Sequence, residues 1–190
     1  MASGSPRRAE LLRAAGVEFR VVPSLAEEPR YAGGPPADYA RAVALFKAAA
    51  VAGEVGSGVV VGADTVVVLD GEVFGKPASA AEARGMLERL SGRTHEVLTA
   101  VALVDAGAGV SLVAHDSTRL TLCPLEAADL DWYLATGEAM DKAGAYALQG
   151  EAARFVTTVD GDPETVIGLP TRLVRRLVER LPAGSVGYPE

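Results

Sequence analysis

The segment 59–69, VVVGADTVVVL, constrains the fold more than any other part of the chain. Its β-branched valines favour a strand, and its apolar character is nearly continuous instead of alternating. Such a run is typical of a strand that is buried on both faces. The dipeptide Asp70-Gly71 follows at once and predicts a hairpin turn.

Helices and strands are predicted to alternate along the rest of the chain. Ser5 as N-cap, Pro6 at the first helical position and Gly16 as the stop predict a first helix. Ser79-Ala-Ala-Glu82 is a capping box that opens a helix running to about residue 90. Further helices are predicted over 38–52, 125–136 and 170–181, and strands over 17–22, 94–104, 111–122 and 154–159. Hairpins mixed with helical crossovers predict an α/β fold with a mixed twisted sheet flanked by helices.

The length of 190 residues is enough to bury one sizeable core. We therefore expect a single domain over residues 1–190, with 183–190 as a tail.

No apolar run approaches the roughly 20 residues that a membrane span needs, and the amino terminus lacks the order of a signal peptide. A cytoplasmic protein without membrane contact is expected. The single cysteine, Cys123, excludes an internal disulfide and a multi-cysteine zinc site, and its apolar neighbours predict ordinary burial.

The charged residues limit the kinds of ligand. A net charge of -7 argues against a general nucleic-acid surface, so any anionic ligand must be held by a local cationic cluster. The chain has 15 Arg but only three Lys, no Asn and a single Gln, Gln149. A compact ammonium is not interchangeable with a guanidinium inside a site, so Lys47, Lys76 and Lys142 are candidates for specific roles.

The string Ser3-Gly4-Ser5-Pro6-Arg7-Arg8 gathers two hydroxyls and two guanidiniums at a predicted helix start. Together with the free amide groups of that helix start, they form the kind of site that an oligophosphate requires. The alternative is a capped surface helix with two solvated arginines.

Asp64 lies inside the buried run, in the string GADTVV. An ionised carboxylate in a buried strand is costly unless it binds a cation or performs chemistry. Asp64 is therefore the leading candidate for a catalytic acid. The alternative is a carboxylate at the end of a strand that caps a neighbouring group.

Two later strings are less specific. GEVFGKP resembles a P-loop, but its spacing is one residue short and Pro77 replaces the hydroxyl that would bind magnesium, which excludes Walker-type binding. Lys76 can still meet a phosphate as a point charge. DKAGAYALQG, residues 141–150, indicates either a loop whose backbone approaches a ligand closely or a polar turn. Glu28, next to Glu27, is interpreted as a solvated acid. His95 is interpreted as a structural residue.

Six strings, in the right order over almost the whole chain, resemble the Maf-like nucleotide pyrophosphatases: ASGSPRR, GADTVV, FGKP, LSGRTHEV, DKAGAYALQG and VIGLP. The late loop is similar to the branch of the family that acts on dTTP and UTP. The resemblance implies hydrolysis of a nucleoside triphosphate to a monophosphate and pyrophosphate, as house-cleaning of nucleotide pools with a link to cell-division arrest. It also implies an elongated two-lobed fold with a central cleft, a homodimer, and dependence on Mg²⁺ or Mn²⁺.

The same resemblance gives roles to individual residues. Asp64 is the catalytic residue and, with Glu28, a metal ligand. Arg7, Thr65 and Gln149 influence base choice. The further substrate-binding candidates are Ser3, Ser5, Arg8, Glu28, Lys47 and Lys76.

Two rival functions stay open from the sequence. One is a nucleotide-binding regulator of septation with little turnover, which would tolerate Asp64→Asn. The other is a pyrophosphatase of broader specificity that acts on non-standard nucleotides. In addition, the apolar strand that normally precedes ASGSPRR in the family would end at Met1 here, so either the true start lies upstream or the edge of the sheet is weakened.

Overall fold

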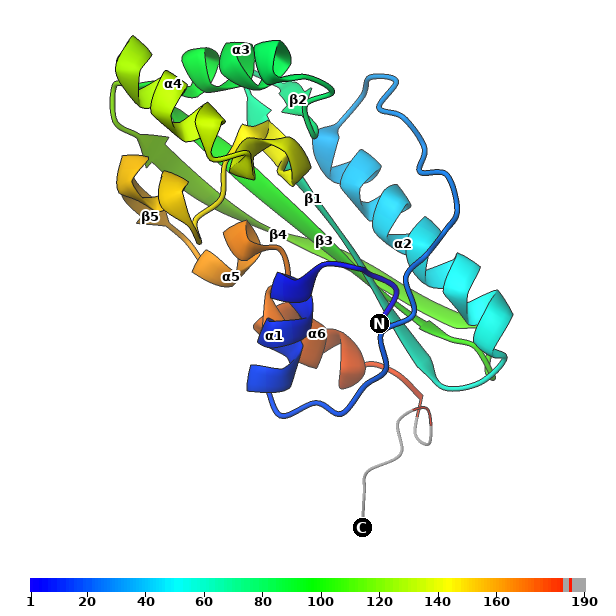
Figure 1. Ribbon diagram of the computed structural model, residues 1–190. Helices are drawn as coiled ribbons and strands as arrows, with labels where there is room; N and C mark the ends of the chain where they lie inside the picture. The colour runs from blue at the N-terminus through cyan, green and yellow to red at the C-terminus, as the bar shows by residue number, and fades with distance from the viewer. Residues whose placement is uncertain (183–184, 186–190) are drawn as a thin grey trace. The chain divides into compact units, whose positions relative to one another are not determined.

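The computed structural model describes residues 1–182 and 185, and within them five strands form one sheet in the order β2-β1-β3-β4-β5 (Figure 1). The strands are β1 (Val59–Leu69), β2 (Glu72–Phe74), β3 (Thr94–Asp105), β4 (Val110–Leu122) and β5 (Val156–Asp160). The α-helices are α1 (Pro6–Ala14), α2 (Pro36–Val55), α3 (Ala80–Leu90), α4 (Ala127–Ala135), α5 (Pro163–Ile167) and α6 (Thr171–Val178). Three short 3₁₀ helices, Glu138–Asp141, Ala143–Ala145 and Glu151–Phe155, lie between α4 and β5.

The strands of the sheet run antiparallel. β1 pairs with β2, and β4 with β5, in antiparallel register. β3 and β4 are consecutive neighbours joined by a short loop. The amide of Ala106, just after β3, donates to the carbonyl of Gly58, just before β1, so these two strands also run in opposite directions. The predicted α/β architecture, a sheet flanked by helices, is confirmed, whereas the sheet is antiparallel and not mixed.

The hairpin predicted at Asp70-Gly71 is confirmed as a two-residue turn between Leu69 and Glu72, which are partners in the ladder. Asp70 has φ 53 and Gly71 has φ 81. Positive φ at both central residues is the requirement of the turn that matches the twist of the flanking strands. Asp tolerates this conformation and Gly has no Cβ to oppose it.

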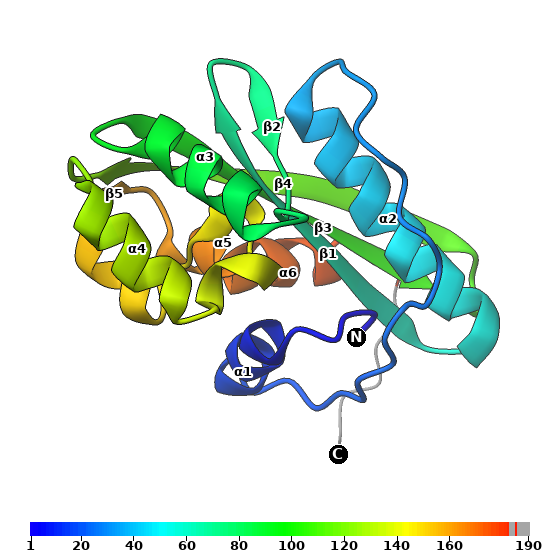
Figure 2. The ribbon, with the colours of Figure 1, turned by 45° about the horizontal axis from the view of Figure 1, so that its top comes forward.

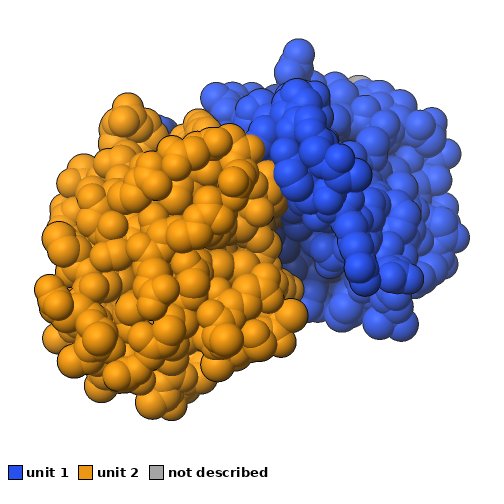
Figure 3. All heavy atoms as spheres, turned by 90° about the horizontal axis from the view of Figure 1, so that it is seen from above, with its two compact units in different colours: residues 1–64, 99–116, 168–190 blue, residues 65–98, 117–167 orange. Residues whose placement is uncertain are grey.

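Two compact units make up the chain, and Figure 3 colours them separately. Unit 1 comprises residues 1–64, 99–116 and 168–190, and unit 2 comprises 65–98 and 117–167. The single domain expected over 1–190 stays a prediction. The expected tail lies outside the described residues, apart from Ser185.

In unit 1, helices cover both faces of the strands (Figure 2). Ala63, Val101 and Leu103 pack against α1 and α6 through a cluster that includes Leu12 and Leu173. The neighbouring residue of β1, Gly62, faces α2 instead, because a Cβ built on it would meet the carbonyl oxygen of Ala44 at 2.4 Å and the Cβ of Ala48 at 2.9 Å. Successive residues of β1 therefore serve opposite layers, as the nearly continuous apolar run predicts.

In unit 2, one core lies under α3 and α4. Leu87 and Tyr133 of these helices pack with Val67, Val97 and Leu120 of three strands. Cys123 packs against the same core but is only partly buried, less than its apolar neighbours predict.

His95 is 4% exposed in unit 2, and its Nε2 lies 2.6 Å from the hydroxyl of Tyr146. Burial lowers the pKa of His95 to about 4 and raises the pKa of Tyr146 well above its usual value. The structural role expected for His95 agrees with this buried, uncharged pair.

One predicted strand is wrong. Residues 17–22 form no strand, because their backbone meets only a short partner: the amide of Val22 donates to the carbonyl of Met1, and the amino group of Met1 donates to the carbonyl of Arg20. Other boundaries shift. α2 is longer than predicted, α4 and α6 are shorter, and Arg154 belongs to a 3₁₀ helix that precedes β5.

We predict that Gly62→Ala lowers the free energy of unfolding by about 2–3 kcal/mol, since the added methyl group would overlap the backbone of α2. The matched control is Gly85→Ala in α3, where an added Cβ meets nothing within 4 Å. That change should be neutral or stabilising by up to about 1 kcal/mol, because alanine is the better helix former. Urea unfolding of both variants measures the difference, and equal stabilities would contradict the close packing of α2 on β1.

Candidate active site

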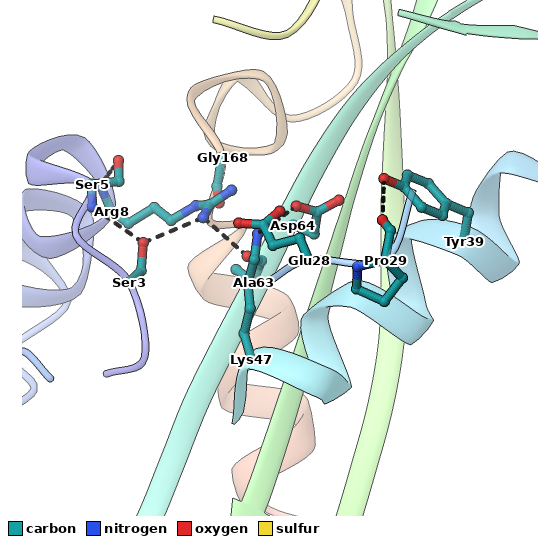
Figure 4. Close-up of polar contacts among 10 residues, drawn as sticks. All are labelled: Ser3, Ser5, Arg8, Glu28, Pro29, Tyr39, Lys47, Ala63, Asp64 and Gly168. Carbon is teal, nitrogen blue, oxygen red and sulfur yellow. Dashed lines mark hydrogen bonds and ion pairs between the residues drawn. The ribbon is translucent and has the colours of Figure 1, made fainter. Parts of the chain in front are cut away.

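Asp64 is the centre of a cluster of charged side chains in unit 1 (Figure 4). It follows Gly62 and Ala63 in β1, so its side chain lies on the same face as Gly62, toward α2. Lys47 of α2 donates a hydrogen bond to its Oδ1 at 2.8 Å. Asp64 and Lys47 are 8% and 9% exposed. Asp64 sits in the interior of a strand and pairs with a cation, which rules out the alternative of a strand-end cap.

Glu28 brings a second carboxylate to the same ammonium. Its Oε2 lies 2.9 Å from Nζ of Lys47, and its side chain is about half exposed, at 52%. Lys47 therefore bridges a buried acid and a half-exposed acid. Glu28 is thus both solvated and paired with Lys47, and its role as a metal ligand stays a prediction.

Tyr39, which no sequence pattern singles out, holds the segment next to Glu28. Its hydroxyl donates to the carbonyl of Pro29 at 3.1 Å, and its ring stands edge-on to that of Tyr31. Partial burial raises the pKa of Tyr39, and the nearby carboxylates of Asp64 and Glu28 raise it further. The hydroxyl thus stays a hydrogen-bond donor at neutral pH.

Arg8 connects three segments of unit 1 through its guanidinium. Nε donates to the carbonyl of Gly168 at 2.8 Å, and Nη1 donates to the carbonyl of Ala63 at 3.0 Å and to Oγ of Ser3 at 3.3 Å. Burial lowers the pKa of Arg8, an effect that the charges of Asp64 and Glu28 oppose. The alternative of two solvated arginines is therefore wrong for Arg8.

The two hydroxyls of the first string shape the start of α1. Oγ of Ser5 accepts from the amide of Arg8, which confirms Ser5 as the N-cap. Oγ of Ser3 accepts from the amide of Ser5 at 3.2 Å. Arg7 is partly buried, and its charge adds to the forces that lower the pKa of Arg8. Ser3, Ser5 and Arg8 thus meet at one helix start, while the part of Arg7 in a phosphate site stays a prediction.

The remaining candidates belong to unit 2. Thr65 follows Asp64 in β1 and is partly buried, while Lys76 and Gln149 are exposed. The amide of Gly144 donates to the carbonyl of Gly75 at 3.0 Å, so the loop 141–150 lies directly against the FGKP string.

The glycines of the loop 141–150 have a structural cause as well. Gly144 has φ 68 and Gly150 has φ 106, and added Cβ atoms would meet Val67 and Glu138. Lys142, the third lysine, donates to the carbonyl of Glu138 and pairs with Asp141. Close backbone packing within unit 2 explains both glycines, so they do not by themselves indicate a ligand.

The carboxylates fit a divalent metal that arrives with phosphate oxygens. Within the part of the chain that the structure describes, no three side chains of His, Cys, Asp or Glu gather as metal ligands. Mg²⁺, however, is commonly held by one or two carboxylates plus the phosphates of a substrate. Asp64 and Glu28 supply such a pair.

No helix among the described residues is both long and apolar enough to cross a membrane.

The fold and this cluster define the class: an α/β protein in which strand β1 carries a buried acid close to two cations. The family model described as Maf-like protein matches residues 1–181. A protein from Symbiobacterium thermophilum named dTTP/UTP pyrophosphatase is 49% identical over 190 residues, covering 100% of this chain and 94% of the relative. Proteins of the same name from Bacillus cytotoxicus and Koribacter versatilis are 49% and 46% identical, covering 93% and 95% of this chain and 92% of each relative. The chain belongs to the Maf-like family, as its strings predict.

We predict that Arg8→Lys lowers the free energy of unfolding by about 2 kcal/mol, because an ammonium cannot reproduce the fork that reaches both Gly168 and Ala63. Arg7→Lys is the matched control, since no side-chain hydrogen bond or ion pair of Arg7 is found within residues 1–182 and 185, and its stability should change by less than about 0.5 kcal/mol. Thermal and urea unfolding would decide the matter. Equal losses in the two variants would show that Arg8 does not hold these segments together.

Proposed function

We propose that this chain hydrolyses dTTP and UTP to the corresponding monophosphate and pyrophosphate. The observation that carries the proposal is the buried acid Asp64 on strand β1 of a Maf-like chain, where it pairs with Lys47 and lies next to Arg8. Relatives that cover nearly the whole chain are named dTTP/UTP pyrophosphatases, and this name agrees with the charged cluster. A triphosphate requires cations and an acid of this kind.

Each candidate residue would have its own role in the reaction. Asp64 would accept a proton from the water that attacks the α-phosphorus, or would hold a metal together with Glu28. Arg7, Arg8, Lys47 and Lys76 would neutralise the phosphates and the charge that develops on the leaving pyrophosphate. Mg²⁺ or Mn²⁺ bound by Asp64 and Glu28 would supply further neutralisation of phosphate charge. Ser3 and Ser5 would keep the cationic helix start in shape, which follows from their hydrogen bonds.

The bond that breaks tests the reaction directly. Hydrolysis in ¹⁸O-labelled water should place the label in UMP or dTMP, because the proposed attack is on the α-phosphorus. Mass spectrometry of both products measures this. Release of orthophosphate and a nucleoside diphosphate would mean that the reaction is a different one.

We predict that Asp64→Asn lowers turnover by at least about a hundredfold, the usual scale for losing a catalytic base, while nucleotide binding survives. Steady-state kinetics and calorimetric titration with UTP separate the two effects. Glu27→Gln is the matched control: Glu27 is exposed, neighbours Glu28, and should leave turnover within about twofold. Near-normal turnover of Asp64→Asn would contradict the assignment of Asp64 as the catalytic acid.

We predict that Gln149 reads the pyrimidine base. Its amide can accept from N3–H of uracil or thymine and donate to an adjacent carbonyl, whereas cytosine presents the opposite pattern. Gln149→Glu keeps an acceptor but loses the donor. The ratio of kcat/KM for UTP to that for CTP should therefore fall by about tenfold or more.

A constant ratio of kcat/KM for UTP to that for CTP would contradict this prediction. If both substrates decline together and the ratio holds, Gln149 shapes the loop instead of reading the base. Since Gly150 beside it packs against Glu138, such a structural effect would also lower the melting temperature. Gln149→Met is the control without hydrogen-bonding groups.

The remaining parts of the proposal are a homodimer in the cytoplasm, house-cleaning of nucleotide pools and a link to division arrest. The resemblance to the Maf-like family supports them. Light scattering measures the dimer. A panel of standard and modified nucleotides separates dTTP and UTP from the non-standard substrates of a broader enzyme.

A further inference from the structure

Lys47 already neutralises the two carboxylates that the proposed function assigns to a metal. Its ammonium lies 2.8 Å from Oδ1 of Asp64 and 2.9 Å from Oε2 of Glu28. The side chains of Lys47 and Asp64 are only 11% and 12% exposed, so water contributes little to solvating their charges. The acids therefore have a resident cation.

The charges of the side chains in the cluster nearly cancel. Asp64 and Glu28 contribute two negative charges, and Lys47 and Arg8 contribute two positive charges that interact with them. Arg8 is tied to the carbonyls of Gly168 and Ala63 and stays in place. A divalent cation that approaches this cluster meets little net attraction and is repelled by the ammonium.

Glu28 is also held in this arrangement. It lies in the segment before α2, where the hydroxyl of Tyr39 bonds the carbonyl of Pro29. The segment that carries Glu28 is thus tied to α2, which places its carboxylate within reach of Lys47. Because the ion pairs form within the protein alone, they compete with a metal for the same oxygens.

A triphosphate changes this balance. It carries several negative charges and offers the ammonium of Lys47 an alternative partner, as lysines in phosphate sites commonly do. Once the ammonium turns to a phosphate, oxygens of Asp64 and Glu28 become available to a cation. The phosphates add further oxygen ligands at the same time.

We propose that Lys47 acts as an internal counter-cation, which keeps divalent metal away from Asp64 and Glu28 until a triphosphate takes over its ammonium. Metal therefore binds together with nucleotide and not before it. This inference rests on the proposed function in one respect, the assignment of Asp64 and Glu28 as metal ligands. Lys47 accordingly has two roles: it controls when metal can bind to Asp64 and Glu28, and it binds phosphate.

The test is a titration of the protein with Mn²⁺, in which electron paramagnetic resonance measures the concentration of free Mn²⁺. No nucleotide is hydrolysed in this experiment. The wild-type protein alone should bind Mn²⁺ at least about tenfold more weakly than the protein saturated with α,β-methylene-UTP, after correction for the Mn²⁺ affinity of the nucleotide itself. Wild-type protein that binds Mn²⁺ equally well with and without the analogue overturns the inference. This arm needs no variant.

Lys47→Met should bind Mn²⁺ at least about tenfold more tightly than the wild type in the absence of nucleotide, and Mn²⁺ should raise its melting temperature. Lys47→Arg keeps the positive charge and should stay weak. Lys47→Met combined with Asp64→Asn should lose the gain. A folded Lys47→Met variant without tighter binding overturns the inference. If tighter binding occurs but the ¹⁸O experiment shows no pyrophosphate release, the proposed reaction fails while the role of Lys47 stands.

Discussion

The close packing of α2 on β1 at Gly62 determines where the charged cluster forms. Without a side chain at Gly62, the helix backbone lies directly on the strand, and Lys47, one turn beyond Ala44 on α2, meets Asp64 two residues along β1. A buried ammonium and a buried carboxylate are each costly alone and tolerable only together. The steric constraint and the electrostatic one therefore act on the same pair of elements. The position of Asp64 depends on a glycine that performs no chemistry.

Local sequence patterns were sufficient to predict those elements that depend on local chemistry. β1 begins and ends at the predicted residues, because its valines and the Asp70-Gly71 turn specify strand and hairpin over a short stretch. Ser79 caps α3 as predicted, although the carboxylate of Glu82 accepts from the amide of Ala78 and not from that of Ser79. Residues 17–22 have a strand-like composition, but a strand also needs a partner of similar length, which no local pattern reveals.

The candidate site was predictable in its acids and cations but not in its connections. Asp64 was conspicuous because a carboxylate interrupts an apolar run, and Lys47 because lysine is rare in an arginine-rich chain. Lys142 shares that rarity, yet it pairs with its own loop, so scarcity alone does not identify a site. Tyr39 gave no signal at all. Its hydroxyl bonds a backbone carbonyl ten residues away. Every residue type has such a carbonyl, so the sequence does not reveal the contact.

The cluster also shows why one cation is a lysine and the other an arginine. The planar guanidinium of Arg8 reaches two backbone carbonyls and a hydroxyl in different directions, and carbonyls are fixed parts of the fold that need a fixed donor. The ammonium of Lys47 faces two carboxylates on a flexible stem, and its three donors impose no plane. A fork suits a permanent connection between segments, whereas a point charge on a mobile stem can change partners when a more negative ligand arrives. The geometry thus separates a cation that builds the site from one that can respond to its occupant.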